Sequence, residues 1–256
     1  MNDLIALILE YHATLADQAE AATLVFLRVG AVMATLPAFG EQSVPARIRL
    51  VLALVFSAAI APIALPISQG IGLEQGFGPE VAIGLVLGLF VRFFILALMM
   101  AGTIAANATS LSQLFPSGSE PQPSISHLLV MAGLALAVQS DLHLRILSYL
   151  IMSYDMLPVG RWPNSGLIAE WGIAQVSRSF SLAFMIAMPF VLASLLYNVA
   201  LGVINRAMPQ LMVTFIGAPA LSLGGLILLA MVTPVALVVW LNALNHFLAM
   251  PIGPIP

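Results

Sequence analysis

The chain has 256 residues, of which 61% are hydrophobic and 7% are charged, and its formal net charge is −3. Soluble domains carry about 25% charged residues, so this composition predicts an integral membrane protein or a subunit of a very apolar assembly. The chain has no basic patch and is not expected to bind nucleic acid, and without cysteine it can form neither disulfides nor thiolate metal sites.

The first 20 residues contain four acidic side chains and no basic one. A secretory signal peptide needs a positively charged beginning, so we interpret this stretch as a short amphipathic helix.

Hydrophobic runs make up most of the remaining chain, and each is expected to form a helix. Several contain proline or glycine and are expected to be kinked or broken. The predicted fold class is therefore all-α, with polytopic membrane-associated helical hairpins in a single domain over residues 1–256. The six runs cover about residues 21–36, 50–67, 80–106, 127–154, 174–205 and 211–248.

Charged side chains inside these runs need a partner. A guanidinium at the bilayer centre costs about 2.5–3.5 kcal/mol, so Arg28 is expected to face protein or an aqueous interface. Asp141 and Arg145 are four residues apart on one helical face and could form a structural ion pair, whereas His143 points elsewhere on the helix. Charged residues at membrane depth also mark functional sites in other proteins, and this alternative stays open.

Two further patterns concern helix contacts and the membrane surface. Gly84 and Gly88 form a GxxxG motif, which lets two helix backbones approach closely, although chance produces the motif as readily. Tyr154, Trp162 and Trp171 are suited to the aromatic belt at a membrane interface.

The segment 107–123 interrupts the apolar chain. It contains three prolines and one glycine, and proline disfavours helix both at its own position and at the preceding one. Its length of about 17 residues exceeds the usual 2–8 of helix–helix connections. Irregular backbone cannot face lipid, so the segment lies in water or fills a cavity walled by protein. A solvated surface loop and a segment folded into a pore are both compatible with the sequence.

Motifs of catalysis are missing. The four histidines have no paired metal-ligand spacing, and neither a nucleotide-binding loop nor a nucleophile elbow is present. Neither enzyme activity nor a cofactor is expected.

Four stretches, in this order, resemble the FliR family of the flagellar type III export apparatus, whose injectisome relatives are the SctT proteins. They cover nearly the whole chain and read FLRVGAVMATLPAFGEQSVPARIRLVLAL, EVAIGLVLGLFVRF, SDLHLRILSYLIMSYDMLPVG and NRAMPQLMVTFIGAPA.

The resemblance implies a subunit of an export gate in the bacterial inner membrane, at the flagellar basal body. The implied partners are FliP-like and FliQ-like gate subunits, an FlhB-like switch protein and the unfolded proteins that the gate exports. In such gates much of the assembly is raised out of the bilayer plane, and the central FliR loop acts as a plug. The segment 107–123 occupies the corresponding position.

Two groups of residues follow from this hypothesis. The plug is expected to depend on Leu111, Leu114, Phe115, Pro116, Gly118 and Pro121. Structural or assembly roles are expected for Pro37, Pro45, Arg47, Asp141, His143, Arg145, Arg206, Pro209 and Gln210.

Two other functions remain alternatives. A small-solute secondary transporter also uses broken helices, but it is expected to show two matched halves, which this sequence lacks. A structural membrane scaffold without a passage is the second alternative.

Overall fold

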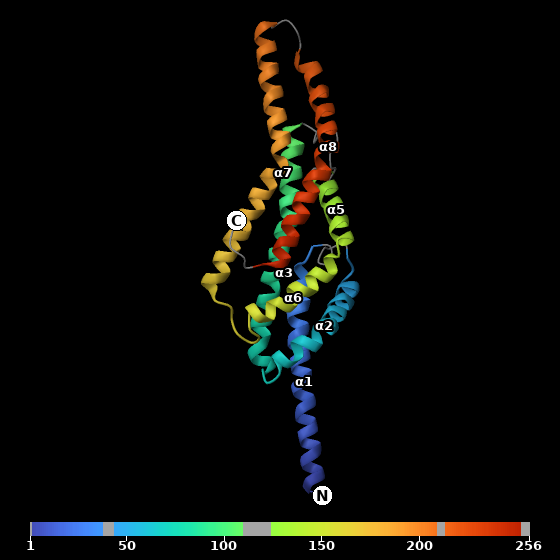
Figure 1. Ribbon diagram of the computed structural model, residues 1–256, viewed down its shortest axis with the longest axis vertical. Coiled ribbons are helices and arrows are strands. Elements are labelled where there is room, and N and C mark those ends of the chain that lie inside the picture. The colour runs from blue at the N-terminus through green and yellow to red at the C-terminus, as the bar shows by residue number, and fades with distance from the viewer. Residues whose placement is uncertain (1, 38–43, 110–123, 209–212, 252–256) are drawn as a thin grey trace. The chain divides into compact units, whose positions relative to one another are not determined.

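The structure is a computed structural model, and it describes residues 2–37, 44–109, 124–208 and 213–251. No strand occurs in these ranges, which confirms the predicted all-α fold class. Figure 1 shows the helices, which are α1 (Asn2–Thr35), α2 (Ala46–Ser68), α3 (Leu73–Ala108), α5 (Ser124–Gln139), α6 (Leu142–Met156), α7 (Ser165–Ala207) and α8 (Val213–Ala249).

Four of the described helices are long and apolar enough to cross a membrane. They are α2, α3, α7 and the Pro219–Ala249 part of α8, and the pair α5 and α6 makes a fifth candidate if it is counted as one bent span. Proline lies inside several of these helices without ending them, as Pro189 does in α7. Neighbouring helices can satisfy the backbone groups that proline leaves unpaired in an apolar setting.

The run 127–154, which we expected to be one helix, is two helices bent by 77°. The break is at Asp141, whose φ of 60° lies in the left-handed region. The Ser140 N–H still bonds back into α5, whereas the N–H groups of Leu144 and Arg145 bond to the Asp141 carbonyl oxygen and begin α6. Aspartate tolerates the left-handed conformation better than most residues. Periodicity could not show this break, because both halves are apolar.

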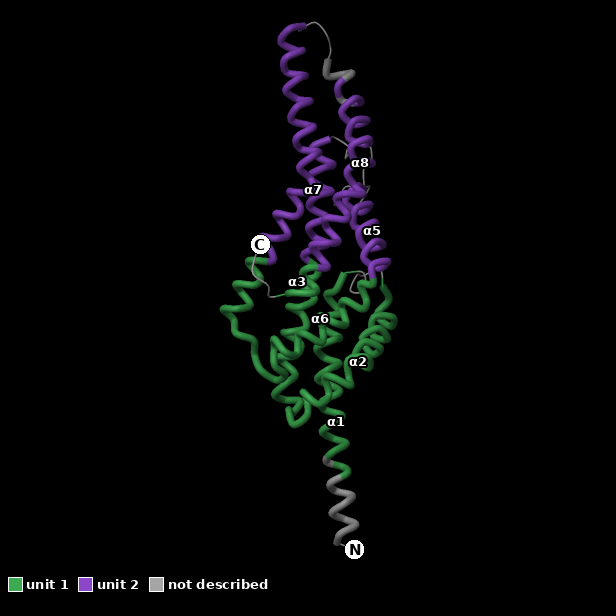
Figure 2. Tube along the Cα trace, viewed as in Figure 1, with its two compact units in different colours: residues 1–92, 141–174, 246–256 green, residues 93–140, 175–245 purple. Residues whose placement is uncertain are grey.

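Two compact units make up the chain, each built from separate stretches of sequence (Figure 2). Unit 1 comprises residues 1–92, 141–174 and 246–256, and unit 2 comprises residues 93–140 and 175–245.

In unit 1, α1 and α3 pack with their backbones close together. A Cβ atom on Gly84 would overlap the carbonyl oxygen of Arg28, and one on Gly88 would overlap Thr35. The GxxxG motif therefore marks the contact between α3 and α1. Beside this contact, the hydroxyl of the buried Tyr149 donates to the Leu87 carbonyl oxygen at 3.2 Å.

In unit 2, Trp240 of α8 occupies the core and is fully buried. Its indole N–H donates to the carbonyl oxygen of Phe94 in α3 at 2.8 Å. Gly133 of α5 faces this indole and leaves room for Leu98, because a Cβ there would come within 2.6 Å of the Leu98 side chain. One buried aromatic residue thus joins α3, α5 and α8.

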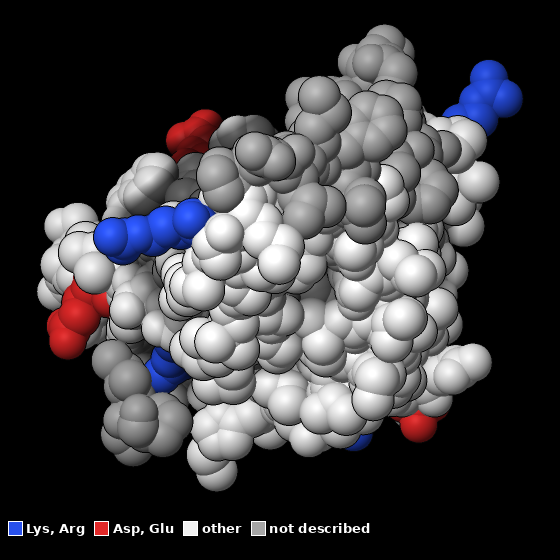
Figure 3. Space-filling model, turned by 90° about the horizontal axis from the view of Figure 1, so that it is seen from above, with Lys and Arg blue, Asp and Glu red and all other residues white. Residues whose placement is uncertain are grey.

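The surface matches the low charge of the sequence. On the face drawn in Figure 3, uncharged side chains predominate among the described residues and charged ones are few. Exposed large hydrophobic residues are frequent along α7, including Phe184, Leu192 and Leu196. Such a surface suits lipid or other apolar chains.

Candidate functional site

The two ends of the connection 110–123 are held by contacts within unit 2. The hydroxyls of Thr103 in α3 and Ser126 in α5 lie 3.1 Å apart, and Ser126 also donates to the Met99 carbonyl oxygen at 3.1 Å. Gly102 faces the backbone of Ser126 so closely that a Cβ would overlap it. The end of α3 and the beginning of α5 are therefore in direct backbone contact.

Thr109, the last described residue before the connection, is fixed as well. It is buried, and its hydroxyl donates to the Ala105 carbonyl oxygen at 2.7 Å. Its side chain packs on Gly225 of α8, where a Cβ would come within 2.7 Å of the Thr109 Cβ. We call Thr103, Thr109, Ser126 and Gly225 the base of the connection.

A small apolar cluster supports this base. Ala106, Ile125 and Leu129 are buried together, and Leu226 and Leu229 of α8 pack against them. The connection therefore leaves from and returns to a packed surface made by three helices.

An apolar groove with a volume of about 580 Å³ lies near the base in unit 2. Thr103 belongs both to the base and to the groove lining. The lining comes from α3 and α7, and it includes Phe93, Met99, Phe180 and Phe184. No charged residue lines it.

A buried ion pair is the main polar feature of unit 1. Arg28 of α1 and Glu80 of α3 are both fully buried, and two hydrogen bonds of 2.6 and 3.0 Å join them. Because both guanidinium contacts go to one carboxylate, the pair is bidentate, which is the strongest geometry for such ions. The expectation that Arg28 faces protein is confirmed.

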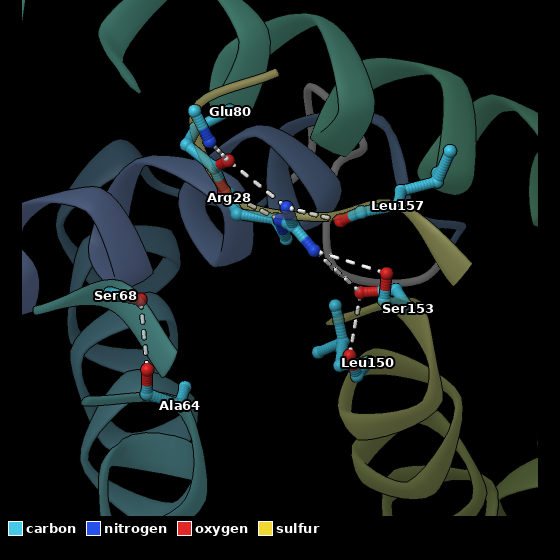
Figure 4. A network of polar contacts seen from close by, with 8 residues as sticks. Arg28, Ala64, Ser68, Glu80, Leu150, Ser153 and Leu157 are labelled. Atoms are coloured by element: carbon cyan, nitrogen blue, oxygen red, sulfur yellow. Dashed lines mark hydrogen bonds and ion pairs between the residues drawn. The ribbon is translucent and has the colours of Figure 1, made fainter. Parts of the chain in front are cut away.

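The remaining donors and acceptors of this pair bond to the end of α6 and the turn after it (Figure 4). Arg28 donates to the carbonyl oxygens of Ser153 at 3.2 Å and Leu157 at 2.9 Å. Glu80 accepts the Gly160 N–H at 3.1 Å. A cation at a helix C-terminus is favourable, because the last carbonyl groups there lack partners within the helix.

The ring of Tyr154 also lies at this site, 4.1 Å from the Arg28 guanidinium carbon. Tyr154 is buried, so it belongs to this cluster and not to an aromatic belt. Trp162 is 70% exposed and remains suited to a membrane interface.

The residues expected to form the plug, 111, 114, 115, 116, 118 and 121, lie outside the described residues, as do Pro209 and Gln210. The predicted irregular segment begins later than residue 107, because Asn107 and Ala108 still belong to α3.

The other predicted assembly residues lie at helix ends. Pro37 is buried just after α1, and Pro45 precedes α2, in whose first turn Arg47 is exposed. Asp141, His143 and Arg145 are exposed at the start of α6, and Arg206 is exposed in the last turn of α7. The structure does not bring these residues together in one site, and pairing of Asp141 with Arg145 stays a prediction.

Sequence reasoning missed Glu80, Ser153 and the base of the connection. Glu80 was treated only as the beginning of a hydrophobic run. The sequence did contain a signal for this pair. An acid at the edge of an apolar run needs a cation, and Arg28, inside another apolar run, needs an anion. Hydroxyl and glycine contacts such as those of Thr103 and Gly225 have no comparable sequence signal. Among the described residues, no group of three or more His, Asp or Glu side chains could hold a metal ion.

Comparison with known proteins connects the chain to protein export. The family described as "Bacterial export proteins, family 1" matches residues 19–247. The chain is 34% identical over 242 residues to the flagellar biosynthetic protein FliR of Caulobacter vibrioides, covering 91% of this chain and 96% of the relative. It is 32% identical over 221 residues to that of Escherichia coli (81% and 82% covered) and 28% identical over 207 residues to that of Bacillus subtilis (77% and 79% covered).

Proposed function

The chain belongs to the bacterial export proteins of family 1, and its relatives named FliR connect it to flagellar export, so we propose that it is a subunit of the type III export gate. In this proposal unfolded flagellar substrates cross the inner membrane through the gate. The 107–123 segment plugs the gate at rest, and residues 1–256 act as one gate domain.

The observation that supports the proposal is the base of the connection. A plug needs fixed attachment points, because a stopper whose ends move cannot close a conduit reproducibly. Thr103 with Ser126 and Thr109 with Gly225 provide such points on three helices. The candidate membrane spans in α2, α3, α7 and α8 support a place in the membrane.

The proposed mechanism uses the composition of the segment. Leu111, Leu114 and Phe115 provide apolar contacts that exclude water and ions from the conduit. Gly118 and the prolines at 116 and 121 allow packing without regular structure. The contacts must be weak enough for an entering substrate to displace them, so opening is a shift between two populated states.

The proposed assembly contains FliP-like and FliQ-like subunits and an FlhB-like switch protein. Co-purification of the full chain with a FliP-like subunit tests this part. The assembly residues at helix ends, such as Pro45 and Arg206, are proposed to set the geometry of the hairpins that meet these neighbours.

The plug itself is tested by replacing residues 110–123 with a flexible five-residue glycine–serine link. The start of α5 lies against Gly102 of α3, and Thr109 is about 10 Å from Gly102 along the chain direction of α3. Five extended residues reach about 17 Å, so the link can join Thr109 to the start of α5 with the base intact. We expect the variant to assemble and to leak ions in a conductance measurement on the gate complex, because the stopper is gone.

A variant of unchanged length sharpens this experiment. Replacing Leu111, Leu114 and Phe115 by serine is expected to cause the same leak, whereas replacing Ser112, Ser117 and Ser119 by alanine is expected to leave the gate closed. If the shortened variant assembles and stays impermeable to ions, the plug is wrong, while membership of the export family is unaffected.

A further inference from the structure

A second pocket lies in unit 1, and it shares only Leu157 with the contacts of the buried ion pair. Its volume is about 290 Å³, and ten of the residues between 156 and 171 line it, from the end of α6 to the first turns of α7. Arg161, Trp162 and Trp171 are among the lining residues. A cation beside two indole rings is a combination that the gate proposal does not use.

The walls of this pocket are held in place. The Trp162 ring packs on Gly78 of α3, where a Cβ would come within 2.8 Å of the ring. The Asn164 side chain accepts the N–H groups of Gly166 and Leu167 at 2.9 and 3.3 Å and so fixes the start of α7. The backbone N–H of Gly160, next to Arg161, bonds to the buried Glu80. The pocket is therefore anchored on both sides of Arg161.

The charge of the pocket is positive. Arg161 is exposed, and within the described ranges no hydrogen bond or ion pair engages its side chain. Asp155 and Glu170 are the acids nearest in sequence, and neither lines the pocket. The guanidinium suits a phosphate, because its planar N–H groups match phosphate oxygens in pairs.

The position of the pocket points to the membrane surface. It lies where α6 ends and α7, a candidate span, begins, beside the first turns of α3, another candidate span. The exposed part of the non-helical backbone there, at Pro158 and Arg161, must meet water or lipid headgroups and not hydrocarbon. Tryptophan is enriched at this depth, and the exposed Leu167 beside the pocket offers apolar surface to an acyl chain.

From these observations we propose that the pocket binds the headgroup of an anionic phospholipid. Arg161 bonds to the phosphate, and the indole N–H groups of Trp162 and Trp171 donate to headgroup oxygens. Ligand pockets commonly measure about 300–1,000 Å³, so this one holds a headgroup while the acyl chains stay in the bilayer. The inference needs only the pocket and does not rest on the plug.

The test uses the full-length chain together with any subunits that accompany it. It is placed in nanodiscs of phosphatidylcholine alone or of an equal mixture with phosphatidylglycerol, and native mass spectrometry measures the retained lipid. We expect retention of phosphatidylglycerol over phosphatidylcholine, and a loss of this preference by about threefold to tenfold in Arg161→Gln, as for removal of one basic residue at a lipid surface.

Matched variants distinguish lipid binding in this pocket from a general attraction of anionic lipid to exposed positive charge. Arg47→Gln removes another exposed arginine of unit 1 outside the pocket and is expected to keep the preference. Arg161→Lys keeps the positive charge but not the paired N–H groups, and it is expected to keep only part of the preference, while circular dichroism checks that each variant retains its helices. Equal losses in Arg161→Gln and Arg47→Gln, or no loss in either, would overturn the proposal.

Two further outcomes identify a different ligand and also overturn it. If inorganic phosphate displaces phosphatidylglycerol completely from the wild-type chain, the pocket takes free phosphate. If a photo-crosslinker at position 162 captures an accompanying subunit and no lipid in the mixed nanodiscs, the pocket is a protein contact. Capture of phosphatidylglycerol by that crosslinker supports the proposal.

Discussion

At the scale of single residues, Arg28 and Glu80 depend on each other. Each is fully buried, and removal of one leaves the other charge without compensation. Loss of one partner of a buried pair costs about 3–5 kcal/mol, whereas replacing both by apolar residues costs far less.

We therefore expect Glu80→Gln to lower the free energy of unfolding by about 3–5 kcal/mol. Arg28→Met combined with Glu80→Leu is expected to lose less than Glu80→Gln alone. Denaturant unfolding of the chain in detergent micelles, followed by circular dichroism, measures both. The exposed Arg47→Gln is the control, expected to change stability by less than about 0.5 kcal/mol. Equal stability of Glu80→Gln and wild type would show that the pair contributes nothing.

At the scale of helices, the contact of α1 with α3 depends on two glycines. The atom that opposes Gly84 is the backbone carbonyl oxygen of Arg28, which cannot rotate away as a side chain can. Gly84→Ala must therefore separate the helices, and we expect a loss of about 1–3 kcal/mol, as for other overpacked cores.

The control for this prediction is Gly202→Ala in α7, where nothing lies within 4 Å of the added Cβ. It is expected to be neutral or to stabilise by about 0.4–1 kcal/mol, because alanine restricts the unfolded chain. The unfolding midpoints of the two variants provide the comparison. A Gly84→Ala midpoint equal to that of Gly202→Ala would contradict the close packing of α1 and α3.

At the scale of the whole molecule, each of the two compact units has buried contacts of its own. Glu80 contacts Arg28 and Gly160 in unit 1, whereas Gly133 faces Leu98 and Trp240 in unit 2. Because these sites share no partner, we expect the losses of Glu80→Gln and Gly133→Ala to add within about 0.3–0.5 kcal/mol in the double variant. Unfolding free energies of the wild type, both single variants and the double variant measure this coupling, and a coupling above about 1 kcal/mol would show that the cores are not independent.

Much of the fold could be predicted from the sequence, because long apolar runs in a chain with few charged residues leave helices as the main option. The run 127–154 shows the limit, since the break at Asp141 depends on one backbone angle that an apolar pattern does not encode. Tyr154 shows another limit, because a tyrosine near a helix end suits an interface and a buried guanidinium equally well. The resemblance of four stretches identified the family, whereas no sequence pattern indicated that the Thr109 side chain packs on Gly225.

The position of Trp240 late in the chain has a consequence for biosynthesis. α3 and α5 leave the ribosome well before α8 supplies the indole that fills the space between them. Unit 1 has the same dependence, because Phe247 brings its ring to 5.7 Å from that of Tyr149. Neither unit reaches its final packing before α8 has been made. A nascent chain stalled before α8 carries an open apolar interior, and the insertion machinery must keep it from associating with other nascent chains.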